Sequence, residues 1–106
     1  MTLNEYQIEA MKFANYDLRI LYPVIGLAGE TGEVAEKIKK WMRTKRKHLN
    51  EDERNEIAKE LGDVLWYITA LSNDLNLTLD FIACTNLNKL TDRKKRGKIY
   101  GEGDNR

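Results

Sequence analysis

GLAGETGEV, residues 26–34, and KELGDVLWY, residues 59–67, are the two stretches that decide the fold of this 106-residue chain. Each stretch holds two carboxylates spaced three residues apart, next to apolar residues at helical spacing. The carboxylates are Glu30 and Glu33 in the first stretch, and Glu60 and Asp63 in the second. Because residues three apart project from one face of a helix, each pair is expected to border the apolar stripe of its own helix. The sequence therefore predicts two antiparallel helices with four carboxylates along a common seam.

Four helices are predicted in total, and short connections between them favour an all-α four-helix bundle. Thr2 with Glu5, and Asn50 with Glu53, have the spacing of a capping box, and Thr78 is a further candidate N-cap. The predicted helices run from Thr2 to near residues 16–21, from soon after Pro23 to about Arg43, from Glu51 to about Leu75 and from Leu79 to about Lys95. The chain is expected to be one domain, 1–106, in which the glycine-containing residues 96–106 form a flexible or ligand-ordered tail.

Composition excludes several classes of protein. The 18 Lys and Arg residues nearly balance the 17 Asp and Glu residues, so no global field attracts a polyanion. The single cysteine, Cys84, excludes an intrachain disulfide and is expected to be a buried apolar residue, and the single histidine excludes a histidine metal cluster. No apolar run approaches the ~20 residues of a membrane span, and no signal peptide precedes the first helix, so we expect a cytoplasmic protein without a membrane partner.

The four carboxylates have two interpretations. Gathered in one place, they are the hard oxygen donors that Mg²⁺ prefers, with Mn²⁺ as a possible substitute. Alternatively they are solvated or paired with lysines, and Lys37 stands four residues after Glu33 for such a pair. The run from Val64 to Leu71 is apolar nearly all round, which predicts a helix buried on more than one face and an Asp63 shielded from open water. Gly29 and Gly32 then allow close approach either of a metal-bound phosphate or of a packed helix.

Residues 26–34 and 59–67 together resemble the E-x-x-E and E-x-x-D signature of the MazG-like, all-α nucleoside triphosphate pyrophosphohydrolases. Tyr6-Gln7, residues 86–90 and residues 103–106 are similar to family members as well. The resemblance implies that Glu30, Glu33, Glu60 and Asp63 bind Mg²⁺ and that nucleoside triphosphates are cleaved between the α- and β-phosphates, a reaction suited to cleansing the nucleotide pool. The family also suggests one of the glutamates as the general base, for which we select Glu33 at the edge of the stripe.

The resemblance also implies a homodimer or homotetramer with sites completed across chains. A bundle this small, with its third helix apolar around most of its circumference, is expected to associate in any case.

The remaining candidates concern the substrate. Asn86, Lys89 and Arg93 share one edge of the fourth predicted helix and could offer an amide and two cations to phosphate oxygens, although an exposed polar edge has the same pattern. Asn86 and Lys89 also resemble phosphate-binding positions of the family. Tyr67 and Trp41 are candidates for stacking on the nucleobase, although aromatic residues at helical spacing more often belong to the core. An alternative function is a non-catalytic helical module that binds nucleic acid through the basic segments 37–47 and 89–98, which as helix ends are equally expected to be only solvated.

Overall fold

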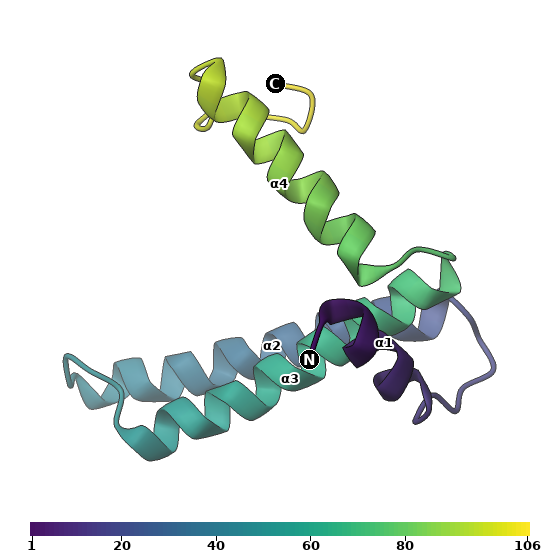
Figure 1. Ribbon diagram of the computed structural model, residues 1–106. Coiled ribbons are helices and arrows are strands. Elements are labelled where there is room, and N and C mark those ends of the chain that lie inside the picture. The colour runs from purple at the N-terminus through teal and green to yellow at the C-terminus, as the bar shows by residue number, and fades with distance from the viewer.

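The computed structural model describes residues 1–106 and consists of four helices without a strand. The helices are α1 (Leu3–Met11), α2 (Leu21–Thr44), α3 (Glu51–Asp74) and α4 (Leu79–Lys95). Figure 1 shows α2 and α3 side by side as a long antiparallel hairpin, with α1 lying across α3 and α4 leading away from the other three. The prediction of an all-α fold is confirmed, and within one chain the fourth helix stands apart from the other three.

A short polar connection, residues 45–50, fixes the antiparallel arrangement of α2 and α3. Lys45 adopts the left-handed conformation (φ 61°) that ends α2. Asn50 and Glu53 form the predicted capping box, in which each side chain accepts a hydrogen bond from the other residue's backbone N–H. Arg46 forms an ion pair with Glu53 and so ties the connection to the first turn of α3.

The boundary between α1 and α2 differs from the sequence prediction. α1 ends at Met11, well before residues 16–21, and α2 begins at Leu21, two residues before Pro23. Proline is tolerated in the first helical turn because its missing N–H has no intrahelical partner there. The steric effect of Pro23 on the preceding residue was therefore overestimated: Tyr22 lies inside the helix.

The connection between α1 and α2 is held by a carboxylate at the end of α3. One oxygen of Asp74 accepts hydrogen bonds from the Tyr16 hydroxyl and the Ile20 backbone N–H, both at 2.9 Å. Ile20 has a φ of 69°, a conformation that is strained for a β-branched residue. Asp74 supplies the contacts that hold it there.

α4 is anchored only near its N-terminus. The Gln7 side chain of α1 donates to the Leu77 carbonyl (3.0 Å) and accepts from the Leu79 N–H (2.8 Å), and Leu79 is buried. Further along, Leu87 and Leu90, which continue the apolar spacing of α4 from Leu79, are exposed, Leu87 at 62%. The apolar stripe of α4 therefore continues past the point where α4 leaves α1.

The core of the single chain is thin. Only eight of 106 residues are buried, among them Thr69 and Ala70 in α3 and Pro23 in α2. Cys84 is exposed, so the prediction of a buried cysteine is wrong, because α4 has no neighbour along its middle. None of the helices is both long enough and apolar enough to cross a membrane.

Candidate active site

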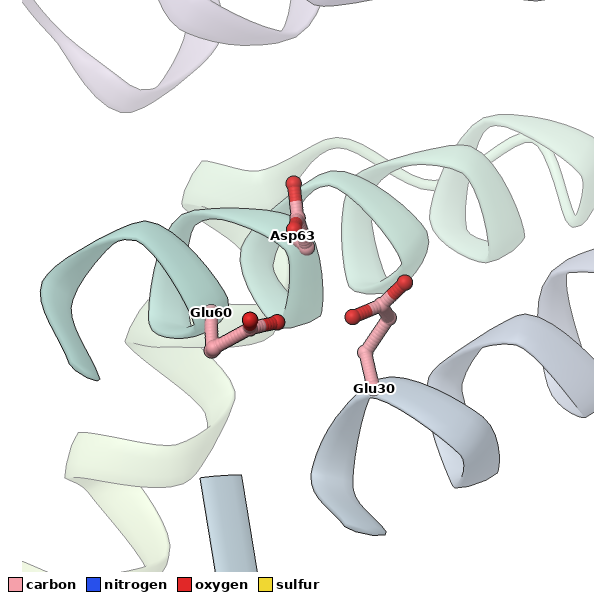
Figure 2. A group of neighbouring side chains, drawn as sticks. All are labelled: Glu30, Glu60 and Asp63. Carbon is pink, nitrogen blue, oxygen red and sulfur yellow. The ribbon is translucent and has the colours of Figure 1, made fainter. Parts of the chain in front are cut away.

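Three of the four predicted carboxylates meet between α2 and α3. Glu30, Glu60 and Asp63 each offer an oxygen within 4.8 Å of the others. Figure 2 shows Glu30 reaching from α2 toward Glu60 and Asp63 on α3. The antiparallel hairpin produces this cluster, because it brings the middle of α2 opposite the middle of α3. All donors are carboxylate oxygens, the set that suits a hard divalent cation rather than zinc or copper.

The cluster is electrostatically unfavourable without a counter-ion. Partial burial raises the pKa of Glu30 above its ordinary value, and the nearby carboxylates of Asp63, Glu60 and Glu33 raise it further. Lys37 lies 3.8 Å from Glu60 and supplies one positive charge at the margin. Carboxylates that repel one another in this way gain stability when a cation neutralises them.

Glu33 lies outside this group of three. It is exposed on α2, and its charge still influences Glu30. The alternative ion pair with Lys37 does not form, because Lys37 reaches across to Glu56 and Glu60 of α3 instead. The fourth predicted carboxylate is therefore near the cluster and without an ion-pair partner.

Asp63 is exposed, which corrects the expectation that α3 shields it from water. The reason is the loose packing of α3 in the single chain. Leu61 and Leu65 flank Asp63 in sequence and are themselves exposed. The apolar run of α3 is covered on the side of α1 and α2 and left open elsewhere.

Tyr67 is the predicted base-stacking residue that the structure does bring to the cluster. Burial and the Tyr22 hydroxyl raise the pKa of Tyr67, with smaller contributions from the charges of Glu30 and Asp63. Its ring lies directly on the backbone of α2 at Gly26, where a Cβ would come within 2.2 Å of the ring. By contrast, a Cβ at Gly29 or Gly32 would meet nothing within 4 Å, so the close approach occurs at Gly26 instead.

The aromatic residues around Tyr67 include one that sequence reasoning missed. Tyr22 stacks on Tyr16, with ring centroids 5.0 Å apart, and its ring lies 6.2 Å from that of Tyr67. Trp66 packs edge-on against both Tyr16 and Tyr67. Burial raises the pKa of Tyr6, and the charge of the nearby Asp63 carboxylate raises it further. The only signal for Tyr22 was its place just before Pro23, in a segment that we expected to lie outside the helix.

Trp41 is not brought to the carboxylates. It lies eleven residues after Glu30 on the same helix, which at 1.5 Å per residue places it about 16 Å further along the axis. Its indole N–H is buried without an acceptor. In the single chain Trp41 belongs to the end of the hairpin near the 45–50 connection.

Asn86, Lys89 and Arg93 lie on the part of α4 that leads away from the hairpin (Figure 1). Asn86 is exposed and Lys89 is half-buried, whereas Arg93 is buried. Lys89 and Arg93 both contact Asp104, a residue that sequence reasoning did not connect with them. A single chain therefore separates the predicted phosphate-binding residues from the carboxylates.

Comparison with known proteins agrees with the resemblance carried by the E-x-x-E and E-x-x-D motifs of this all-α hairpin. Residues 23–97 match the family model of the MazG nucleotide pyrophosphohydrolase domain. The chain therefore belongs to the MazG family, as its resemblance indicated.

Two known proteins illustrate this relationship. Over 85 residues the chain is 47% identical to the Gene 37 protein of Mycobacterium phage L5, covering 80% of this chain and 75% of the phage protein. The fold of this chain is also similar to the crystal structure of iMazG from Vibrio DAT 722. The TM-score is 0.62 and the sequence identity 28%, over 96% of this chain and 100% of that one.

Proposed function

We propose that this protein hydrolyses nucleoside or deoxynucleoside triphosphates between the α- and β-phosphates, releasing a monophosphate and pyrophosphate, with Mg²⁺ or Mn²⁺ as cofactor. The observation that carries the proposal is the carboxylate cluster of Glu30, Glu60 and Asp63, in a chain of the MazG family. A cation held by these carboxylates would in turn bind the anionic oxygens of a triphosphate. Cleansing of the nucleotide pool is a role consistent with this reaction.

Each residue of the cluster has a part in this proposal. Glu30, Glu60 and Asp63 hold the cation, and Glu33 completes the set from the next turn of α2. The bound cation supplies charge neutralisation of the triphosphate and polarisation of the α-phosphoryl group. Glu33, which has no ion-pair partner, is the carboxylate best placed to accept the proton of the attacking water.

The aromatic residues next to the cluster are proposed to receive the nucleobase. Tyr67 is fixed by its contact with Gly26, and its surroundings include the half-exposed ring of Tyr22. A ring held rigidly beside the metal site loses little conformational entropy when a base stacks on it. Trp41 remains a candidate only if a second chain places its end of the hairpin near another site.

We further propose that the active form is a homodimer or homotetramer in which α4 of one chain completes the site of another. The exposed apolar residues are too numerous for an isolated domain, and they occur on every long helix: Leu21 and Ile25 on α2, Leu61 and Leu65 on α3, and Phe81 and Leu87 on α4. A stable interface buries about 800 Å² per partner, and exposed apolar side chains on three helices are the kind of surface from which such an interface is built. Such an assembly covers Leu87 and Leu90 and moves Lys89 toward the carboxylates of a neighbour.

The proposed reaction is tested with a panel of nucleoside triphosphates and deoxynucleoside triphosphates, incubated with Mg²⁺ and resolved by product. Monophosphate and pyrophosphate are expected. Diphosphate and phosphate as products contradict the proposal, since they report cleavage at the β–γ bond.

The shared site is tested by mixing two inactive variants, Asp63→Asn and Lys89→Gln. In a mixed dimer, one of the two sites combines the wild-type Asp63 of one chain with the wild-type Lys89 of the other. Random pairing makes half of the dimers mixed, so about a quarter of the wild-type activity should return. No recovery of activity after subunit exchange means that each site is built from one chain.

The alternative of a nucleic-acid-binding module is separated by salt dependence. In the segments 37–47 and 89–98 several cations already pair with carboxylates of the same chain, namely Lys37, Lys39, Arg46, Lys89, Arg93 and Arg96. These pairs leave fewer cations for a phosphate backbone. Steeply salt-dependent binding of DNA or RNA without monophosphate formation supports the module and contradicts the enzyme.

A further inference from the structure

The segment that follows α4 folds back on it. α4 ends in a Schellman motif, in which the Gly97 N–H donates to the Lys94 carbonyl (3.2 Å) and the Lys98 N–H to the Arg93 carbonyl (2.7 Å). Gly97 has the positive φ (67°) that this motif requires. The chain therefore reverses at residue 97, and the residues after it return along the helix.

Arg106 closes the returning segment into a loop. Its guanidinium donates to three backbone carbonyls of the same segment, those of Lys98 (3.1 Å), Ile99 (2.8 Å) and Gly103 (2.7 Å). These bonds hold the loop without any contribution from the Asp104 side chain. The hydrogen bonds of Arg106 close the loop, and those of the Asp104 carboxylate are not needed for this.

Asp104 binds both cations of the α4 edge. Its Oδ1 lies 3.2 Å from Lys89 Nζ and 3.4 Å from Arg93 Nη2, and its backbone carbonyl accepts from Arg93 Nη2 at 2.6 Å. The two cations lower the pKa of Asp104, the hydrogen bond from Lys89 contributing most. The Arg93 side chain is only 5% exposed beneath the loop, whereas the Asp104 side chain is 83% exposed.

A carboxylate oxygen and a phosphate oxygen bind to a lysine or arginine in the same way. Both are anionic acceptors of charge-assisted hydrogen bonds. One oxygen of Asp104 therefore stands where a phosphate oxygen binds if Lys89 and Arg93 recognise a triphosphate. Because the Asp104 side chain is exposed and its carboxylate does not close the loop, the carboxylate can leave Lys89 while residues 97–106 stay folded. Arg93, which also donates to the Asp104 backbone carbonyl beneath the loop, is freed only when the loop itself lifts from α4.

We propose that residues 97–106 form a displaceable cover on the phosphate-binding edge of α4, in which the Asp104 carboxylate competes with substrate phosphate for Lys89 and Arg93. The inference rests on the proposed function, since it assigns phosphate binding to these cations. It adds that the cover weakens substrate binding and that its removal strengthens it. The opposite effect is expected if Asp104 instead positions the cations for phosphate.

The test compares Asp104→Asn with a matched control, Glu102→Gln. Both changes remove one carboxylate charge from the same segment, and Glu102 forms no ion pair with α4. Binding of inorganic tripolyphosphate is measured by calorimetry in metal-free buffer, on full chains whose melting temperatures match the wild type. Asp104→Asn is expected to lower the Kd about threefold or more, the range of an exposed ion pair, and Glu102→Gln to change it by less. An unchanged or higher Kd for Asp104→Asn overturns the proposal.

A second comparison identifies the cation through which Asp104 acts. In a Lys89→Gln background the gain from Asp104→Asn should shrink, because one of the competed donors has been removed. If Asp104→Asn tightens tripolyphosphate binding just as much in the Lys89→Gln background, Asp104 acts only by long-range repulsion of the anion. That result overturns the proposal that Asp104 competes for Lys89.

The inference and the proposed function fail in different ways. If nucleoside triphosphates are cleaved to monophosphate and Asp104→Asn binds tripolyphosphate no tighter, the cover is wrong and the enzyme stands. If no triphosphate is cleaved and Asp104→Asn binds tripolyphosphate tighter than the control does, the enzyme is wrong and the cover stands.

Discussion

The α2–α3 hairpin and α4 are built in opposite ways. The hairpin is closed by a capping box and an ion pair, and it brings three carboxylates within 4.8 Å of one another. α4 is anchored at its N-terminus through Gln7 and then leads away from the rest of the chain, and two of its cations, Lys89 and Arg93, are held by its own tail (Figure 1). The carboxylate cluster is thus assembled inside one chain, whereas the proposed phosphate-binding cations are carried on a helix without a neighbour along its middle.

The carboxylate cluster depends on two helices that are adjacent in the sequence, whereas the surroundings of α4 do not follow from its own sequence. Neighbouring helices joined by a short connection have only one convenient packing, so their facing residues meet reliably. A helix whose apolar stripe remains exposed is instead expected to pack on a surface that the same chain does not supply. The two halves are therefore expected to respond differently to mutation and to dilution.

The largest effect is expected from the hairpin carboxylates. Glu30→Gln or Asp63→Asn should lower Mg²⁺-dependent turnover by more than about 100-fold, exceeding the loss typical of outer-shell partners of a metal. Each variant should remain folded, and Glu30→Gln should melt at a higher temperature without metal, because a repelling carboxylate is removed. Glu36→Gln, on the same helix but paired with Lys39, is the control and should keep its activity. Retained turnover in either cluster variant removes that residue from the metal site.

The second effect concerns the close contact inside the hairpin. Gly26→Ala places a methyl group within 2.2 Å of the Tyr67 ring and should cost about 1–3 kcal/mol or more of unfolding free energy, as overpacking does. Gly29→Ala meets open space and should stabilise α2 by up to about 1 kcal/mol. Denaturant unfolding of the two variants makes the comparison. Equal stabilities would show that Tyr67 does not lie on α2.

The third effect breaks the proposed association without touching the hairpin. Leu87→Asp puts a charge on the exposed stripe of α4, and since burial of a leucine is worth about 1.5–3 kcal/mol, the dimer Kd should rise at least about tenfold. Sedimentation velocity across a dilution series measures the change. Asn88→Asp, one residue along and exposed, serves as the control. A dimer of undiminished affinity in Leu87→Asp shows that this stripe does not form the interface.

The smallest effect concerns the anchor of the α1–α2 connection. Burial, followed by the hydrogen bond to Asp74, raises the pKa of Tyr16 from 10.0 to about 12. The stabilisation linked to this raised pKa is fully present below pH 10, the pKa of the tyrosine in the unfolded chain. It is lost as the pH rises from about 10 toward 12. Tyr16→Phe should cost about 1 kcal/mol at neutral pH, as loss of one hydrogen bond does. That difference from the wild type should shrink at pH 11. A difference that stays constant with pH means that the Tyr16 hydroxyl does not titrate in this window.

Sequence alone predicted four helices, the N-caps Thr2, Asn50 and Thr78, and three of the four clustered carboxylates, because the caps and the three-residue spacings are local signals. The capping box predicted at Thr2 and Glu5 is wrong in one half: the Thr2 side chain accepts from the Glu5 N–H, but the reciprocal bond forms only in the box of Asn50 and Glu53. The end of α1, the start of α2 and the exposure of Asp63 were predicted wrongly, because they depend on the tertiary anchor at Asp74 and on how far α3 is covered. Asp104 and Tyr22 were missed for the same reason: no local spacing indicates their partners.

The connection 45–50 also determines the order in which the two halves of the site appear. Contacts closed by one short turn form early, on the timescale of hairpin and helix formation, and they need no second molecule. In the proposed assembly, docking of α4 on a neighbour is bimolecular, takes about milliseconds to minutes and slows on dilution. A newly made chain would then have its carboxylate cluster before it meets a partner, and the concentration of the protein would set when the proposed phosphate-binding edge arrives.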